Sequence, residues 1–146
     1  MTLSTIERVL FLRGVELFNQ IASEELVYVA RVCQEVYFRP GEQFITQGDI
    51  GDCLYILIEG EASVVIDDVG DIFYRASKDI LGEMAIISRN PRSANCIAIT
   101  DITALRINYD DFWDLMAEKP ALALGVIKVL ASRLDEVVKD LSRQAR

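Results

Sequence analysis

The sequence predicts a mainly β domain with helices at both ends. Between residues 35 and 107, short apolar runs alternate with turns rich in glycine and aspartate, which is typical of a sandwich or barrel. In residues 1–34 and 108–146, the apolar residues instead recur at helical spacing. The chain has 146 residues, of which 51% are hydrophobic and 26% charged, so it can bury the core of one domain.

The N-terminal segment, residues 1–34, is expected to form two short helices. Ser4 and Glu7 fit a capping box, in which each side chain bonds the backbone N–H of the other residue, and Gly14 ends that helix. A second capped helix begins around Ser23, with acidic residues in its first turn that complement the helix dipole. One face of this helix carries Leu26, Val29, Ala30 and Cys33.

The central segment, residues 35–107, is expected to form short strands. Their predicted ranges are 36–38, 43–46, 54–58, 62–66, 72–75, 96–99 and 104–107. Residues 67–71 predict a hairpin tip, because they contain glycine and aspartate between two strand-like runs. Thr100 and Asp101 predict a turn around which the last two strands pair.

The C-terminal segment, residues 108–146, predicts two more helices. Asn108 is expected to cap the first, and Pro120 suits the first position of the second. Apolar residues of the second helix alternate by steps of four and three, at Ala123, Ile127, Leu130, Leu134, Val137 and Leu141. Such a seam has two interpretations: the helix docks on its own barrel, or it pairs with a second copy of the chain in a homodimer.

Charge argues against nucleic acid and membranes as partners. The net charge is −8, and both DNA and anionic membranes are bound chiefly through Lys and Arg. No apolar run reaches the length of a membrane span, and the N-terminus lacks the basic region of a signal peptide. We therefore expect a cytoplasmic protein that contacts neither DNA nor membrane.

The cysteine and histidine contents argue against metal and acid–base chemistry. Cys33, Cys53 and Cys96 share no CxxC spacing, so they are expected to be reduced thiols in the core. The chain contains no histidine, the commonest metal ligand and general base. No nucleophile–base pair can be assembled from the motifs either. We therefore expect no enzyme activity, no metal and no cofactor.

The stretch from residue 81 to residue 98 combines groups that suit an anionic ligand. Gly82 permits a tight backbone turn before a short helical turn at 83–87, whose N-terminus attracts anions. A loop follows, and then Arg92, whose guanidinium fits two phosphate oxygens at once. Ser93 adds a hydroxyl. This layout suits a ligand with one negative group and one hydroxyl to donate.

Two motifs in this stretch resemble the phosphate-binding cassette of cyclic-nucleotide-binding domains: Gly82-Glu83-Met84-Ala85 and, after a gap, Pro91-Arg92-Ser93-Ala94. That family includes proteins of the catabolite activator and cyclic-nucleotide-dependent kinase regulatory subunit type. The resemblance assigns the ribose 2′-hydroxyl to Glu83 and the cyclic phosphate to Arg92. It also implies that the backbone N–H groups of Ala85 and Ser93 complete the phosphate cradle.

The resemblance further implies the fold and the domain organisation. Residues 35–107 are expected to form a double-stranded β-helix, or jelly-roll, barrel, and residues 108–146 to form lid or dimerisation helices. The chain departs from the family pattern at three places. Ser77-Lys78-Asp79 replaces a Pro-Gly-Asp turn, Leu81 replaces a phenylalanine, and Asn95 stands where threonine is commoner.

The sequence leaves open which cyclic nucleotide binds and which residue covers its base. Ser93 does not decide between the bases, and cAMP is expected only because it is the commoner bacterial-style ligand. Family members often cap the base with an aromatic residue from the last helix, but no Phe, Tyr or Trp follows Trp113. The cap is then Leu130 or Leu134, or the guanidinium of Arg133 stacked on the base. Such a cap predicts affinity in the micromolar range.

The sequence therefore predicts a cyclic-nucleotide sensor, free-standing or part of a larger signalling protein, whose effector is not visible in the sequence. Two alternatives remain. One is a degenerate domain without ligand that acts as a protein-interaction or dimerisation module. The other is a sensor that binds cGMP.

Overall fold

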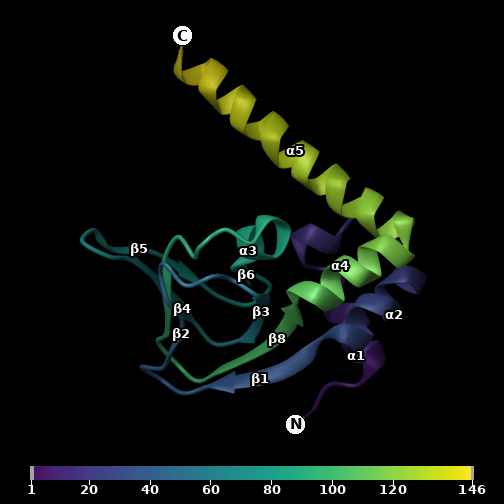
Figure 1. Ribbon diagram of the computed structural model, residues 1–146, viewed down its shortest axis with the longest axis horizontal. Helices are drawn as coiled ribbons and strands as arrows, with labels where there is room; N and C mark the ends of the chain where they lie inside the picture. Colours follow the sequence, from purple (N-terminus) through teal and green to yellow (C-terminus); the bar gives the residue numbers. More distant parts are fainter. Residues whose placement is uncertain (1, 146) are drawn as a thin grey trace.

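The computed structural model describes residues 2–145, except for the side chains of residues 71–73 and 84–86. This part of the chain forms two antiparallel sheets flanked by helices (Figure 1). The strands are β1 (Gln34–Phe38), β2 (Gln43–Ile45), β3 (Cys53–Glu59), β4 (Ala62–Ile66), β5 (Gly70–Arg75), β6 (Ile80–Leu81), β7 (Asn95–Ala98) and β8 (Ile102–Asn108). The helices are α1 (Thr5–Leu12), the 3-10 turn η1 (Glu16–Phe18), α2 (Ser23–Val32), α3 (Glu83–Ser88), α4 (Tyr109–Glu118) and α5 (Pro120–Gln144).

Each sheet has four strands. The first has the order β1-β8-β3-β6 and the second the order β2-β7-β4-β5, with neighbouring strands antiparallel. This architecture confirms the predicted mainly β fold with helices before and after the strands. The two-residue strand β6 was not predicted, because it is too short to show a period in the sequence.

The predicted pairing of strands 96–99 and 104–107 is wrong. β7 pairs with β2 and β4, whereas β8 pairs with β1 and β3, so the two strands lie in different sheets. The connection between them is held by another turn, since Ile99 N donates to Glu61 O at 2.9 Å. Gly60, at a φ of +97°, lies so close to Asp101 that a side chain would collide there. The chain therefore crosses from one sheet to the other instead of making a hairpin.

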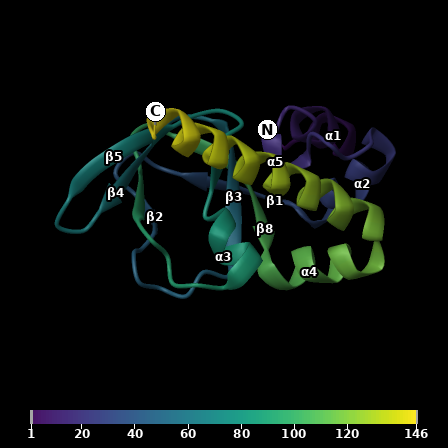
Figure 2. The same cartoon turned by 90° about the horizontal axis from the view of Figure 1, so that it is seen from above.

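Strand β3 is buried on both faces, as its apolar run predicts. Leu54 and Ile56 pack with the helices, while Tyr55 and Leu57 pack between the two sheets. This alternation follows from the two-residue period of a strand. The first sheet is thus a middle layer between the helices and the second sheet. Seen from above, α1, α2 and α4 gather at the end of the molecule away from β4 and β5 (Figure 2).

The N-terminal helices follow the sequence closely. Glu7 N donates to Ser4 Oγ at 3.2 Å and Ser4 N to Glu7 Oε1 at 3.1 Å, so the predicted capping box opens α1. Helix α2 begins at Ser23, but no side chain caps it, and Ala22 occupies the N-cap position. Asn108 likewise precedes α4 without a side-chain cap. The predicted apolar face of α2 is buried.

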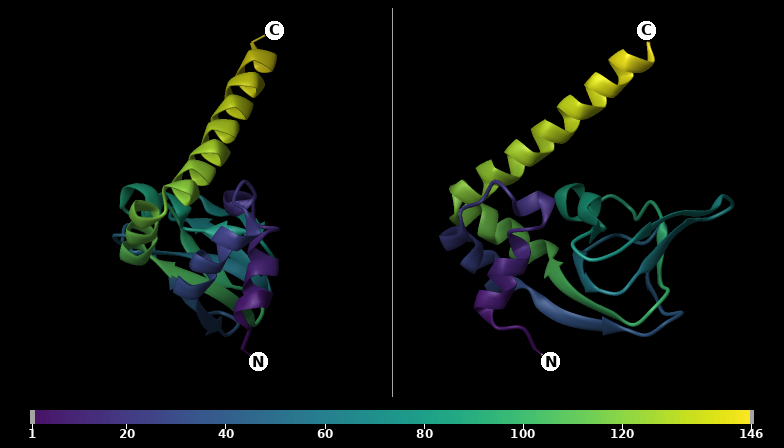
Figure 3. Two further views of the ribbon diagram at one scale, coloured as in Figure 1. Left: turned by 90° about the vertical axis from the view of Figure 1, so that its right-hand side faces the viewer. Right: turned by 180° about the vertical axis from the view of Figure 1, so that it is seen from behind.

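Helix α5 begins at Pro120, as predicted, and has two unlike halves. Its first half packs on the domain through Leu122, Gly125, Val126 and Val129. Its second half leaves the body of the domain (Figure 3). There, Leu134, Val137, Val138 and Leu141 are between 53% and 66% exposed. No helix within residues 2–145 has the length and apolar character needed to span a membrane.

Candidate functional site

A cavity of about 360 Å³ opens beside α3 and contains most of the predicted site. The predicted residues that line it are Gly82, Glu83, Pro91, Arg92, Ser93 and Ala94. Apolar side chains from the second sheet, including Ile45 and Val64, line it as well. Polar cassette groups therefore face an apolar wall, which is the usual composition of a small-molecule site.

Arg92 is the cassette cation in this cavity, and its guanidinium is held by carbonyl groups. Nη2 donates to Cys53 O at 2.7 Å, and Nη1 donates to Gly82 O at 3.3 Å. Its backbone is fixed as well, since Arg92 N donates to Asp49 O at 2.7 Å and Gly48 N donates to Arg92 O at 2.9 Å. A guanidinium has five N–H donors, so donors are left for an anion in the cavity.

Gly82 is required by the position of Arg92. Its φ is +82°, in the left-handed region that favours glycine, and a side chain there would collide with the Arg92 guanidinium. The glycine therefore both turns the chain from β6 into α3 and leaves room for the arginine.

Glu83 begins α3 and offers one bonded and one unbonded carboxylate oxygen. Oε1 accepts a hydrogen bond from Arg133 Nη1 at 2.8 Å. Oε2 is buried and accepts no hydrogen bond from the described residues. A buried oxygen without a donor is costly and calls for a partner. Glu83 also lines the cavity.

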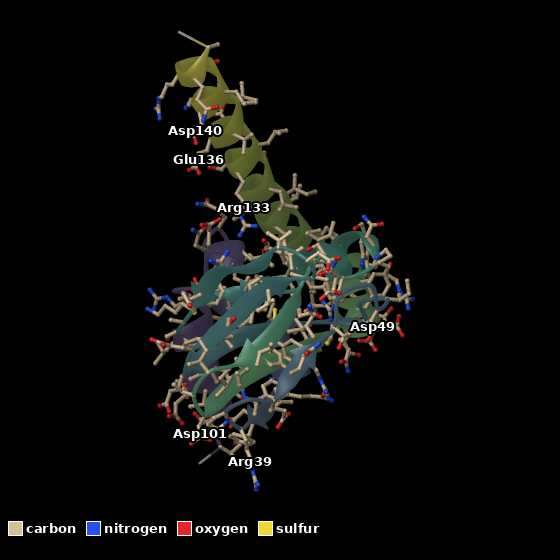
Figure 4. All side chains as sticks on the ribbon, turned by 90° about the vertical axis from the view of Figure 1, so that its left-hand side faces the viewer. Arg39, Asp49, Asp101, Arg133, Glu136 and Asp140 are labelled. Carbon is tan, nitrogen blue, oxygen red and sulfur yellow. The ribbon has the colours of Figure 1, made fainter. Side chains whose placement is uncertain are left out.

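Arg133 reaches the cassette from α5 but does not line the cavity. It pairs with Glu83 on one side, and its Nε donates to Glu16 of η1 on the other. Figure 4 shows it on the part of α5 that faces the domain, below Glu136 and Asp140. The alternative caps differ from it: Leu130 packs on the helical core, and Leu134 is 66% exposed. None of the three lines the cavity, so the cap stays a prediction.

Met84 and Ala85 lie in α3, where the cassette motif places them, but their side chains lie outside the described part of the structure. Their predicted roles therefore stay predictions, as does the role of the Ala85 N–H.

Arg75, at the end of β5, is a cavity residue that the sequence did not reveal. It lines the cavity together with the cassette, and it also lines a neighbouring cavity of about 380 Å³ with Lys78, Asp79 and Arg133. No motif marks it, since it is the last residue of an ordinary strand. A second cation therefore stands near the proposed phosphate-binding arginine.

The three cysteines are buried and free, as expected of core thiols. Burial raises the pKa of Cys33 to about 12 and that of Cys96 to about 11, although Arg8 near Cys33, and Arg92 and Arg75 near Cys96, act in the opposite direction. The Cys96 thiol in the cavity wall is thus neutral at physiological pH and acts as an apolar group.

Comparison with protein families gives a match over the β region and beyond. The model of the cyclic nucleotide-binding domain matches residues 35–119. The chain is 26% identical over 134 residues to a cyclic AMP receptor protein of Thermus thermophilus, covering 89% of this chain and 62% of that protein. It is 36% identical over 88 residues to a cGMP-dependent protein kinase of Plasmodium berghei, covering 60% of this chain and 10% of the kinase.

A cAMP-dependent protein kinase regulatory subunit of Aspergillus fumigatus is 31% identical over 107 residues, which cover 73% of this chain and 26% of the subunit. The chain thus spans between 10% and 62% of the length of these curated relatives.

Solved structures show the same fold. The N-terminal domain of a transcriptional regulator from Streptomyces coelicolor superposes with a TM-score of 0.82 at 23% identity, over 90% of this chain and 94% of that one. A cyclic nucleotide-binding domain from Methylobacillus flagellatus gives a TM-score of 0.75 at 26% identity, over 96% of this chain and 83% of that one. These likenesses agree with the predicted jelly-roll fold.

Proposed function

The chain belongs to the cyclic nucleotide-binding domain family. On this basis we propose that it is a sensor that binds a cyclic nucleotide, with cAMP as the expected ligand. Binding of the nucleotide is transmitted to α5. It acts by binding rather than by catalysis. Two of the relatives described above carry cAMP in their names, a receptor protein and a kinase regulatory subunit. A cytoplasmic location, without DNA or membrane contacts, is part of the same proposal.

One observation carries the proposal: a single cavity is lined by both Arg92 and Glu83, a cation and a carboxylate whose Oε2 accepts no hydrogen bond from the described residues. A cyclic nucleotide offers the two complementary groups, an anionic phosphate and a ribose 2′-hydroxyl. The guanidinium suits the phosphate, because charge-assisted bonds to oxyanions are short and strong. The hydroxyl can donate to Glu83 Oε2 while Oε1 keeps its bond to Arg133. Ser93 lines the same cavity and adds a donor beside the phosphate.

The second candidate ligand is cGMP, and Arg75 favours it. A guanidinium can donate two parallel hydrogen bonds to O6 and N7 of guanine, whereas adenine presents an amino donor in place of O6. Arg75 lines the cavity from β5, away from the cassette. If it reads the base, Arg75→Ala weakens cGMP binding about tenfold or more and changes cAMP binding little. If it does not, both affinities change alike and cAMP stays the ligand.

Helix α5 is the proposed output of the sensor, and a second copy of the chain is its proposed partner. The heptad seam continues past the body of the domain, and its residues there are more than half exposed. An isolated helix end with this seam gains stability by pairing with an identical helix in a coiled coil.

Thermal melting tests the function directly. A ligand present at a hundred times its dissociation constant stabilises the folded state by about 2.7 kcal/mol, so either cyclic nucleotide should raise the melting temperature of the wild type. Arg92→Ala should show no such shift, and 5′-AMP, which lacks the cyclic phosphodiester, should act weakly on both proteins. If neither cAMP nor cGMP shifts the wild type at millimolar concentration, the domain is an interaction module without ligand.

A further inference from the structure

Three polar residues form a closed ring of hydrogen bonds beside the cavity, through their side chains and two backbone N–H groups. Gln47 N donates to Asn95 Oδ1, Asp67 N donates to Gln47 Oε1, and Asn95 Nδ2 donates to Asp67 Oδ1, each at 2.8 Å. The three residues come from separate segments: the turn after β2, the hairpin tip after β4, and the start of β7. Gln43 Nε2 adds a further bond to Asn95 Oδ1 at 3.1 Å.

Asn95 is the buried member of this ring. It is 8% exposed and does not belong to the residues that line the cavity. Its amide is engaged through both atoms, because Oδ1 accepts two hydrogen bonds and Nδ2 donates one to a carboxylate. This side chain therefore bonds neighbouring segments of the protein rather than facing the cavity.

The ring fixes the segment that holds the backbone of Arg92. Gln47, which is bonded to Asn95, is followed at once by Gly48 and Asp49. Gly48 N donates to Arg92 O at 2.9 Å, and Arg92 N donates to Asp49 O at 2.7 Å. A shift of Gln47 is therefore transmitted through two backbone hydrogen bonds to the residue whose guanidinium enters the cavity.

We propose that Asn95 is a positioning residue, which through Gln47 sets the place of Arg92 in the cavity. The chemistry of the ring requires an amide. The Asp67 carboxylate only accepts hydrogen bonds and the Gln47 N–H only donates, so the side chain between them must present one donor and one acceptor. The amide reaches its two partners with two separate atoms, whereas a threonine offers one oxygen on a shorter side chain, and an aspartate places two carboxylates in contact. The consequence for ligand affinity rests on the proposed function, whereas the consequence for the backbone does not.

A swap of donor and acceptor tests the proposal. Asn95→Asp should weaken cyclic-nucleotide affinity at least about tenfold, or about 1.4 kcal/mol, because it opposes the Asp67 carboxylate. Asp67→Asn alone should be mild, since an amide oxygen still accepts from Asn95. The double variant Asn95→Asp/Asp67→Asn reverses the bond and should recover most of the affinity. The control double variant Asn95→Asp/Asp68→Asn makes the same charge change at the next residue and should recover none of the lost affinity.

Hydrogen exchange in the ligand-free protein provides the second readout. The Gly48 and Arg92 amides should exchange about tenfold faster or more in Asn95→Asp, and return toward wild type in the Asp67 double variant. The Ile99 amide, bonded to Glu61 O, should stay unchanged and reports that the fold is intact. This measurement tests the positioning role of Asn95 even if the wild type binds no nucleotide. The proposal is overturned if Asn95→Asp exchanges its Gly48 and Arg92 amides at the wild-type rate. It is also overturned if adding Asp68→Asn restores slow exchange as well as adding Asp67→Asn does.

Discussion

Arg133 Nη1 lies 2.8 Å from Glu83 Oε1, so the final helix contacts the first residue of the cassette helix, 50 positions earlier in the chain. The same guanidinium donates to Glu16 in the N-terminal segment. Burial acts to lower the pKa of Arg133, but its hydrogen bonds to the two carboxylates outweigh burial and raise that pKa. One charged side chain thus joins three segments at the edge of the cavity, and a ligand that engages Glu83 is expected to act on α5 through it.

Arg92→Ala should abolish useful nucleotide binding. Hydrogen bonds to charged groups are each worth about 1.5–3 kcal/mol, and the guanidinium can give two to a phosphate, so a loss of about a hundredfold or more is expected. Arg92→Lys should also bind poorly, because an ammonium cannot reproduce the planar fork. Titration calorimetry measures both. Arg39→Ala, at the opposite end of the molecule from Arg133 in Figure 4, is the control. Wild-type affinity in Arg92→Ala would contradict the phosphate assignment.

Glu83 should govern recognition of the ribose. A 2′-deoxy cyclic nucleotide leaves Oε2 buried and without a donor, so it should bind about tenfold more weakly than the ribonucleotide. Glu83→Gln should narrow this difference. The two ligands are compared by competition in wild type, in Glu83→Gln and in Glu136→Gln, an α5 carboxylate that lies outside the cavity. Equal binding of the two sugars to the wild type would show that Glu83 does not meet the ribose.

Gly82→Ala and Gly41→Ala form a matched pair. Both residues have a positive φ, +82° and +86°, so each alanine should destabilise the fold by about 1–2 kcal/mol. At Gly41 the new methyl group meets no atom within 4 Å, whereas at Gly82 it collides with Arg92. Denaturant unfolding should therefore show a lower free energy of unfolding for both variants. Calorimetry should show weaker nucleotide binding for Gly82→Ala alone. Retained binding in that variant would mean that the guanidinium can occupy another position.

Removal of the chain from Ala131 onward should dissolve the proposed dimer and weaken nucleotide binding. The cut retains the buried half of α5 and removes both Arg133 and the exposed seam. Light scattering and calorimetry measure the two effects. Leu141→Asp separates them, because it should break the dimer while Arg133 and the affinity remain. If the truncated protein binds nucleotide as tightly as the full chain, α5 is no lid and its seam serves association alone.

The sequence predicted those features that depend on local chemistry. The capping box at Ser4, the start of α5 at Pro120 and the gathering of Gly82, Glu83 and Arg92 around one cavity each follow from a few neighbouring residues. The β7–β8 pairing failed because partner choice depends on which sheet receives a strand, and the turn at Thr100 carries no such information.

Side-chain contacts between distant segments could not be predicted from the sequence either. Arg133 and Glu16 are 117 positions apart, and neither belongs to a motif that links them. Arg133 was one of three candidate caps for the base, and its ion pair with Glu83 of the cassette could not be predicted from the sequence. Arg75 could not be identified as a site residue from the sequence, because only the folded structure shows that it lines the cavity.

The division of α5 into an anchored half and a projecting half has a mechanical consequence. The helix is held by packing as far as Leu130 and by the ion pairs of Arg133, and it continues to Gln144. The free arm beyond Arg133 is thus about 16 Å long at 1.5 Å per residue, and a rotation of about 10° at Arg133 would displace its tip by about 3 Å, the length of a hydrogen bond. In the proposed sensor the helix therefore acts as a lever, in which a small adjustment at the ion pair beside the cavity becomes a change of interface at the far end.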